Sequence, residues 1–232
     1  RSIKSDTFGD FEYTEYADGV TITKYIGNGG DVIIPDEIND KPVTEIGQLA
    51  FYNKNNLNSV VLPRYLIKIY NNAFASNDMK RISPLPDSVR YIGSYAFAWN
   101  NFDSFTLNEG VEYIGDYALE ECKITYIPDS VKHLGFGSLE ATTVKTISFG
   151  AGLVNIDDLI FEMNDVDDSS VDELMLESIM VSESNPKYSS VDGVLYNKDK
   201  TELIRYPTEK TDDSFTVPSS VKRIKSYAFK NV

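Results

Sequence analysis

The chain has 232 residues, of which 41% are hydrophobic, and a formal net charge of −14 at pH 7. So acidic a surface repels nucleic-acid phosphates and anionic lipids, which excludes nucleic-acid binding as a main function. The sequence contains no apolar run of about 18 residues, which excludes a membrane-spanning helix, and its single cysteine permits no internal disulfide.

The first 42 residues combine a hairpin pattern with an apolar strand. Residues 11–25 alternate apolar and polar side chains around an Ala-Asp-Gly sequence at 17–19, which is typical of two antiparallel strands and their turn. The apolar residues 32–34 precede Pro35 and indicate a further strand. We expect residues 1–42 to cap one open end of a larger core.

A nine-residue phrase then recurs through residues 43–165 and again near the C-terminus. It has Val or Leu first, Ile or Leu fourth, usually Gly fifth, and often Ala-Phe last. The copies are VTEIGQLAF from Val43, LIKIYNNAF from Leu66, VRYIGSYAF from Val89, VEYIGDYAL from Val111, VKHLGFGSL from Val131, LVNIDDLIF from Leu153 and VKRIKSYAF from Val221. Each unit is too short to bury its own apolar face, so stacked units must share one continuous core.

A second phrase lies between the copies and alternates apolar with polar residues, usually before a proline. Examples are Leu57, Val60 and Leu62 before Pro63; Phe102, Phe105 and Leu107 before Asn108; Val144, Ile147 and Phe149 before Gly150; and Phe215 and Val217 before Pro218. We interpret this phrase as one short strand per coil, stacked into a parallel sheet. Proline suits the end of such a strand because it has no N–H.

The nine-residue phrase is expected to form the opposite wall, with its Val and Ile pointing inward and Ala-Phe closing a short helical turn. Its Gly column also holds Tyr70, so we interpret Gly there as a close-packing preference and not as a need for positive φ. Residues 166–207 hold an irregular repeat with an inserted hairpin, which turns at residues 197–200. Residues 208–232 form a final partial repeat.

These phrases resemble leucine-rich repeats of the BspA type, which occur on surface and secreted proteins of bacteria and some protists. The matching residues are the Ile-Gly-x-x-Ala-Phe cores at 46–51 and 92–97, and the Leu-x-x-Val-x-Leu-Pro strand at 57–63. The resemblance covers residues 32–165 and 208–232. It implies an adhesin or a ligand-binding surface module, and an extracellular or cell-surface location with the signal peptide outside this stretch of chain.

Repeats and resemblance together predict one domain over residues 1–232. The expected fold is a β-rich α/β solenoid, a right-handed leucine-rich-repeat superhelix. It would have a parallel sheet on one wall, short strands and helical turns on the other, and an N-terminal β-hairpin cap.

The sequence contains no motif that indicates a reaction, so we predict that the protein is not an enzyme and uses no cofactor or metal. His133, the only histidine, occupies a column that also accepts Glu45, Lys68 and Tyr91, which is typical of a solvent-facing position. Cys122 aligns with Asn77 and Asn100 and is interpreted as a buried structural thiol and not a reactive one.

Two further features each have a structural and a functional interpretation. Acidic residues gather at Asp157, Asp158, Asp165, Asp167, Asp168, Asp172 and Glu173. They lack the Asp-x-Asp-x-Asp-Gly order of a calcium loop, so we favour a solvated acidic segment. Trp99 follows Ala-Phe-Ala on a loop and either covers the neighbouring coil, which we favour, or is an exposed binding aromatic.

A ligand would meet the outward residues of the strand phrase, which lie between the inward ones. The candidate face comprises Ser59, Val61, Ser104, Thr106, Tyr126, Thr146 and Ser148. Its hydroxyl groups suit wet contacts with a protein or a glycan, although a plain solvated sheet face has the same composition. The opposite wall, with Arg90, Tyr91, Glu112 and Tyr113, is the rival surface.

Two functions follow from this pattern. The first is a non-catalytic extracellular binding or adhesion module that recognises a protein or glycan through the solenoid surface. The second is a structural spacer that presents other domains of a longer cell-surface protein.

Overall fold

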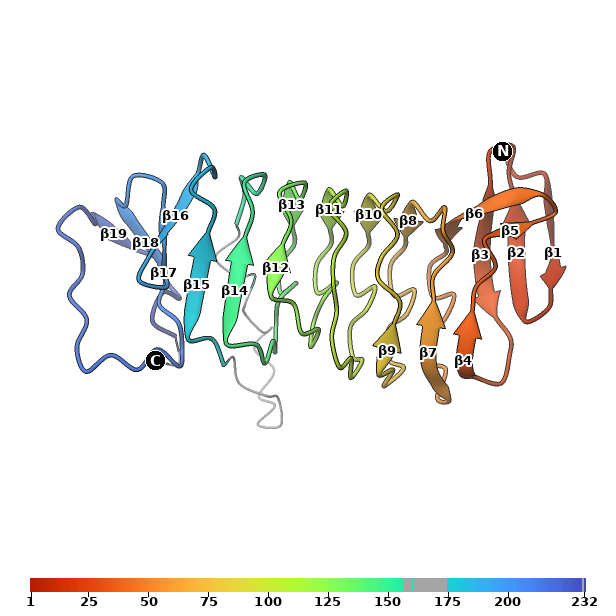
Figure 1. Cartoon of the computed structure of the whole chain (residues 1–232), viewed down its shortest axis with the longest axis horizontal. Coiled ribbons are helices and arrows are strands. Elements are labelled where there is room, and N and C mark those ends of the chain that lie inside the picture. The colour runs from red at the N-terminus through yellow and green to blue at the C-terminus, as the bar shows by residue number, and fades with distance from the viewer. Residues whose placement is uncertain (157–159, 161–174, 231) are drawn as a thin grey trace.

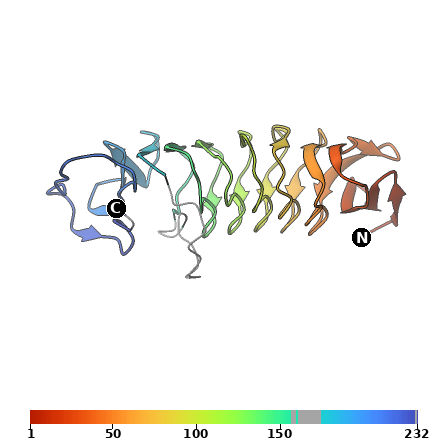
Figure 2. The same ribbon diagram turned by 90° about the horizontal axis from the view of Figure 1, so that it is seen from below.

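A computed structural model describes residues 1–156, 160, 175–230 and 232 of the chain. The coils lie side by side along the long axis of the molecule, with the N-terminal segment at one end and the C-terminal segment at the other (Figure 1). The view from below shows successive coils stacked as narrow loops around a common interior (Figure 2). The solenoid expected from the repeats is therefore confirmed.

One long wall, here called the Ile-Gly wall, is built from the nine-residue phrase. Its parallel strands are β6 (Lys41–Ile46), β8 (Lys68–Ile69), β10 (Tyr91–Ile92), β11 (Tyr113–Ile114) and β13 (His133–Leu134). A bridge from Leu134 to Ile156 extends the ladder. The short strands predicted for this wall are therefore confirmed, and they pair into one continuous parallel ladder, which was not predicted.

The other long wall, here called the Ser/Thr wall, is built from the strand phrase. It holds two parallel sheets: β4 (Gly30–Ile33), β7 (Leu57–Val61) and β9 (Arg81–Ile82), then β12 (Tyr126–Ile127), β14 (Thr146–Phe149) and β15 (Ser178–Val181). The strand predicted at residues 102–107 is wrong, since no strand forms there. The preceding coil carries Pro84 and Pro86 at this level, and neither has an N–H for a ladder bond.

The predicted helical turns, and with them the α/β composition, are wrong, because the described residues contain no helix. The Gly-x-x-Ala-Phe stretch instead forms turns in which the residue two before the Phe has positive φ, as at Asn72 (56°). The Phe74 N–H then donates to the Ala96 carbonyl of the next coil at 2.8 Å. An α-helix would direct these N–H groups to its own carbonyls, whereas here they join one coil to the next.

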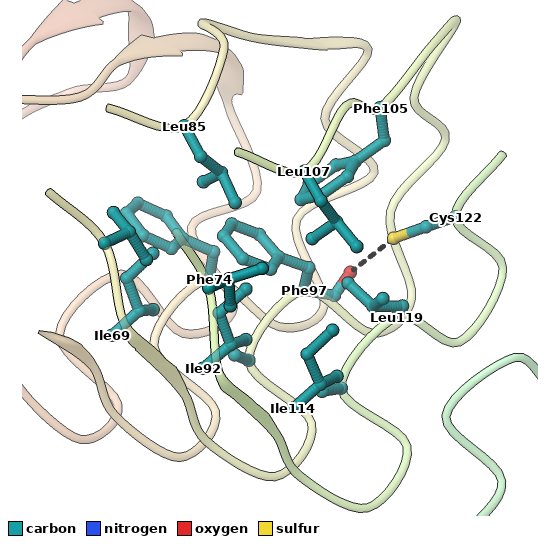
Figure 3. Close-up of a cluster of buried hydrophobic side chains, with 14 of the residues drawn as sticks. Ile69, Phe74, Leu85, Ile92, Phe97, Phe105, Leu107, Ile114, Leu119 and Cys122 are labelled. Carbon is teal, nitrogen blue, oxygen red and sulfur yellow. Dashed lines mark hydrogen bonds between the residues drawn. The ribbon is translucent and has the colours of Figure 1, made fainter. Parts of the chain in front are cut away.

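The core is a file of rings and aliphatic side chains running along the solenoid. Phe51 stacks on Phe74 with ring centroids 4.9 Å apart, and Phe74 stacks on Phe97 at 5.5 Å. Ile69, Ile92 and other inward residues close the space around them (Figure 3). The predicted continuous core is confirmed by this alignment of Phe side chains, and burial of each contributes roughly 1.5–3 kcal/mol.

Close packing explains the Gly column of the Ile-Gly wall. A Cβ added to Gly115 would lie 2.6 Å from the Ser94 nitrogen of the preceding coil, and one on Gly93 would lie 2.7 Å from that of Asn71. Neither glycine has positive φ. The interpretation of this column as a packing preference is confirmed.

The N-terminal cap is a three-stranded antiparallel ribbon. It comprises β1 (Lys4–Phe8), β2 (Phe11–Glu15) and β3 (Val20–Tyr25), and β3 also pairs in parallel with β6. The short β5 (Glu37–Ile38) pairs with β6. The predicted hairpin over residues 11–25 is present, and Tyr25 stacks on Phe51 at 5.2 Å to begin the core file.

Near the C-terminus, antiparallel strands interrupt the repeat. They are β16 (Tyr188–Val191), β17 (Val194–Asn197) and β18 (Glu202–Arg205), and β19 (Arg223–Ile224) then pairs with β18 in parallel. The hairpin expected to turn at residues 197–200 is therefore present. Residues 215–217, expected as a strand, form none.

Candidate functional site

The predicted ligand face lies on the outside of the Ser/Thr wall. Val61, Ser104, Thr106, Tyr126 and Thr146 are exposed, and Ser59 and Ser148 are partly buried. Each alternates with side chains that point into the core, as the strand phrase requires. Ser104 and Thr106 keep this outward placement although their segment forms no strand.

The structure divides this face into two patches because the ladder breaks at residues 102–107. In the patch nearer the N-terminal cap, Ser59 pairs in register with Arg81, and its hydroxyl donates to Asp31 Oδ1 at 2.6 Å. Asn58 Nδ2 donates to the same oxygen at 2.6 Å. These two hydrogen bonds lower the pKa of Asp31, and the bond from Ser59 has the larger effect. The patch therefore holds a carboxylate fixed by hydrogen bonds, and Arg81 on the neighbouring strand is exposed.

The second patch is more amphipathic. Tyr126 pairs with Ser148, and Ser148 pairs with Met180, so the three side chains form one row across β12, β14 and β15. Tyr126 is 42% exposed and Met180 is 53% exposed. A second row places Thr146 beside Ser178.

Sequence reasoning missed Met180 and Ser178 because β15 falls in the interval interpreted as irregular. The signal was present in Leu176, Ile179 and Val181, which have the alternating pattern of the strand phrase. At the edge of this patch, Lys145 Nζ lies 2.7 Å from Glu177 Oε1, and this hydrogen bond raises the pKa of Lys145. The pair is exposed, so it contributes little to stability.

The Ile-Gly wall carries an aromatic row. Tyr91 stacks on Tyr113 at 4.9 Å, and Tyr113 stacks on His133 at 4.5 Å, while Tyr70 meets Tyr91 at 6.1 Å. The rings cover one another's faces, so they offer mainly edges and polar atoms to solvent. The prediction that His133 occupies an outward column is confirmed, and its ring belongs to this row.

The surroundings of Cys122 do not activate its thiol for covalent chemistry. It is 1% exposed, and its Sγ lies 3.9 Å from the Phe97 carbonyl (Figure 3). Burial, followed by the carboxylates of Glu121 and Glu120, raises the pKa of the thiol well above its usual value. The interpretation of Cys122 as a buried structural thiol is confirmed.

The same column contains the asparagines that align with Cys122. Asn100 Nδ2 donates to the carbonyls of Phe74 and Phe97 at 2.8 and 3.0 Å, and its Oδ1 accepts the Met79 N–H at 3.1 Å. Asn77 repeats this pattern one coil earlier. These side chains join neighbouring coils through otherwise unpaired backbone groups.

Within the residues that the structure describes, no group of three or more His, Cys, Asp or Glu side chains could hold a metal ion. The acidic clusters predicted between Asp157 and Glu173 lie outside the described residues. The described part of the chain also holds no helix that could cross a lipid bilayer.

Comparisons with known proteins also identify leucine-rich repeats in this chain. Residues 32–128 match the family model of the BspA type leucine rich repeat region, with six copies. Among curated proteins, none matches the chain.

Several solved structures share the fold. A leucine rich cell surface protein from Faecalibacterium prausnitzii A2-165 has 25% identity and a TM-score of 0.69 over 99% of this chain and 68% of that one. A leucine rich repeat protein from T. pallidum has 29% identity and a TM-score of 0.56 over 63% of this chain and 71% of that one. The pneumococcal vaccine antigen PcpA has 23% identity and a TM-score of 0.65 over 97% of this chain and 62% of that one, so this chain spans less than two thirds of its length.

Proposed function

From the BspA-type leucine-rich repeat region that the chain carries over residues 32–128, we propose a function in binding. The protein is a non-catalytic extracellular binding and adhesion module that recognises a protein or glycan through the Ser/Thr wall. The observation that carries the proposal is the row of Tyr126, Ser148 and Met180 on paired strands. Exposed Tyr and Met side chains are enriched at protein interfaces, and the neighbouring hydroxyls supply hydrogen bonds. Rigid strands hold these groups in place before binding, which lowers the entropic cost of association.

The absence of catalysis is part of the proposal and has support in two residues. His133 is stacked in an aromatic row, and Cys122 is buried with a raised thiol pKa, so neither resembles an activated catalytic group. The cell-surface location is supported by the description of the F. prausnitzii protein, which is similar over 99% of this chain.

A second candidate function is a structural spacer that presents other domains of a longer protein. The observation that favours it is the set of inter-coil bonds from Asn77 and Asn100, which stiffen an elongated molecule (Figure 1). A spacer needs that rigidity and needs no recognition surface.

The test is binding of the folded chain to arrays of glycans and extracellular-matrix proteins. The double variant Tyr126→Asp with Thr146→Asp should weaken binding through the Ser/Thr wall on the order of 30-fold, since loss of a hot-spot aromatic costs about 2 kcal/mol or more. Glu112→Gln, on the Ile-Gly wall, is the matched control and should keep wild-type affinity. Unchanged affinity of the double variant would move the site elsewhere, and no binding by the folded wild-type chain would favour the spacer.

A further inference from the structure

A depression separate from the proposed binding row lies where the Ala-Phe turns lead into the Ser/Thr wall. It has a volume of about 390 Å³ and spans consecutive coils. The side chains that line it include Asp78, Trp99, Asn101, Glu121, Lys123 and Thr143. Its volume is within the range of sites for small ligands, roughly 300–1,000 Å³.

Trp99 is held at the edge of this depression in a fixed orientation. Its Nε1–H donates to Glu120 Oε1 of the next coil at 3.0 Å. Tyr95 stacks beside it with ring centroids 5.4 Å apart and is not part of the depression's wall. Tyr95 covers one side of the indole, while 40% of Trp99 remains exposed and the residue lines the depression.

The turn itself does not require a tryptophan at this position. Trp99 has a φ of 56°, and the equivalent residues of the two preceding coils, Asn53 and Ser76, have φ of 52° and 59°. A left-handed backbone is easier for Asn than for a bulky aromatic residue. A large flat side chain at a position that suits Asn or Ser therefore points to a role beyond forming the turn.

One buried asparagine and several polar side chains line the depression. Asn100 lies in the wall, is 4% exposed, and directs its side chain to backbone groups. Asp78, Asn101 and Glu121 are exposed at the rim, while Lys123 and Thr143 are partly buried. The wall thus offers hydrogen-bond acceptors, amide and hydroxyl groups, and an amine around one aromatic face.

We propose that the Trp99 depression binds a neutral saccharide, with one sugar ring lying on the indole and its hydroxyls bonding to the polar rim. The C–H face of a pyranose suits an aromatic platform, and its hydroxyls need both donors and acceptors. Asp78 and Glu121 disfavour an anionic sugar, as does the net charge of −14. Lys123 in the same wall offsets one of these two negative charges and so weakens the attraction for a cationic peptide.

Intrinsic fluorescence reads this site directly, because Trp99 is the only tryptophan. The full chain is titrated with neutral gluco-, galacto- and N-acetylhexosamine oligosaccharides, with sialylated and sulfated glycans, and with a lysine-rich peptide. A saturable change in Trp99 emission with one or more neutral saccharides is the expected result. Absence of any response to the neutral panel, or a response to the lysine-rich peptide alone, would overturn the proposal.

Variants separate binding from folding. Trp99→Asn places at this position the residue found at Asn53, so the turn should still form and unfolding should stay cooperative, although loss of the bond to Glu120 lowers the thermal midpoint. Calorimetry on the folded variant should find saccharide affinity reduced at least about tenfold. Tyr52→Asn removes another exposed aromatic from an earlier turn and should keep full affinity. Full saccharide affinity in Trp99→Asn would contradict the assignment. The Tyr126→Asp and Thr146→Asp variant should retain saccharide binding, since this site is independent of the Tyr126 row.

Discussion

The side chain of Glu120 is a buried carboxyl in a repeat column that holds small apolar residues in earlier coils. It directly follows the core Leu119, at a position held by Ala75 and Ala98 in earlier coils, and it is only 8% exposed. Glu140 occupies the same place in the next coil and is 6% exposed. Burial, followed by repulsion from Glu140, raises the pKa of Glu120 to about 7, and the bond from Trp99 only partly opposes this.

This carboxyl predicts a pH effect on stability. A pKa raised above the unfolded value of 4.5 means that the contribution of Glu120 to stability is fully present below pH 4.5 and is lost as the pH rises through 7. The expected loss is on the order of 3 kcal/mol, from about 1.4 kcal/mol per pKa unit. Urea unfolding of wild type and Glu120→Gln between pH 4 and 8 measures it.

The difference between the two proteins isolates Glu120 from other titrating groups. The variant should gain stability relative to wild type as the pH rises. Glu109→Gln, which removes one exposed charge, should give no such trend. Parallel pH profiles for wild type and Glu120→Gln would show that Glu120 titrates normally.

Among the elements, the strands of the Ile-Gly wall set how closely the coils approach. On this wall β8, β10, β11 and β13 have only two residues each, so the ladder depends on the turns that follow these strands. Gly93, Gly115 and Gly135 bring the backbone of one coil against that of the preceding coil. The Gly115 N–H can then donate to the Ile92 carbonyl at 2.9 Å.

Substitution of Gly115 by Ala should therefore force β11 away from β10. The added Cβ would meet the Ser94 backbone nitrogen at 2.6 Å, and such overpacking costs typically 1–3 kcal/mol. Gly47→Ala is the matched control, because its Cβ would meet its nearest atom, the Ile22 carbonyl oxygen, at 3.0 Å. Chemical denaturation should find the Gly115 variant less stable than the Gly47 variant, and an equal cost in both would contradict the close-approach explanation.

Across the whole molecule, burial of a repeat residue depends on having a coil on each side. Ile92 and Phe97, in the middle of the solenoid, are both 0% exposed. Ile224 and Phe229 hold the same places in the last described coil and are 48% and 38% exposed. In a stack of this kind, nearest-neighbour contacts supply most of the stability of each unit.

Removal of the same side chain at the two places should therefore have different effects. Phe74→Ala leaves a cavity between two stacked rings and should lower the free energy of unfolding by about 3–5 kcal/mol. Phe229→Ala removes a partly exposed ring and should cost well below half of that. Urea denaturation of both variants measures the ratio, and equal losses would argue against nearest-neighbour stabilisation.

The sequence by itself determined the repeat, the inward residues and the outward ones. A period of 20–23 residues with fixed apolar positions allows only stacked coils, because no single unit can bury its own Phe and Ile. The buried state of Cys122 and the packing role of the Gly column also followed from their columns. The division of the chain into a cap, regular repeats and an irregular segment stays a prediction.

Only the tertiary structure decided how the backbone groups of each turn are paired. Local sequence makes Gly-x-x-Ala-Phe compatible with a helical turn, but hydrogen bonds from Phe51, Phe74 and Phe97 to the next coil stabilise positive-φ turns in its place. The row of Tyr126, Ser148 and Met180 joins residues up to 54 positions apart, and the depression beside Trp99 joins residues of separate coils. Such neighbours depend on strand register and coil stacking, which are non-local and therefore not readable from any one stretch of sequence.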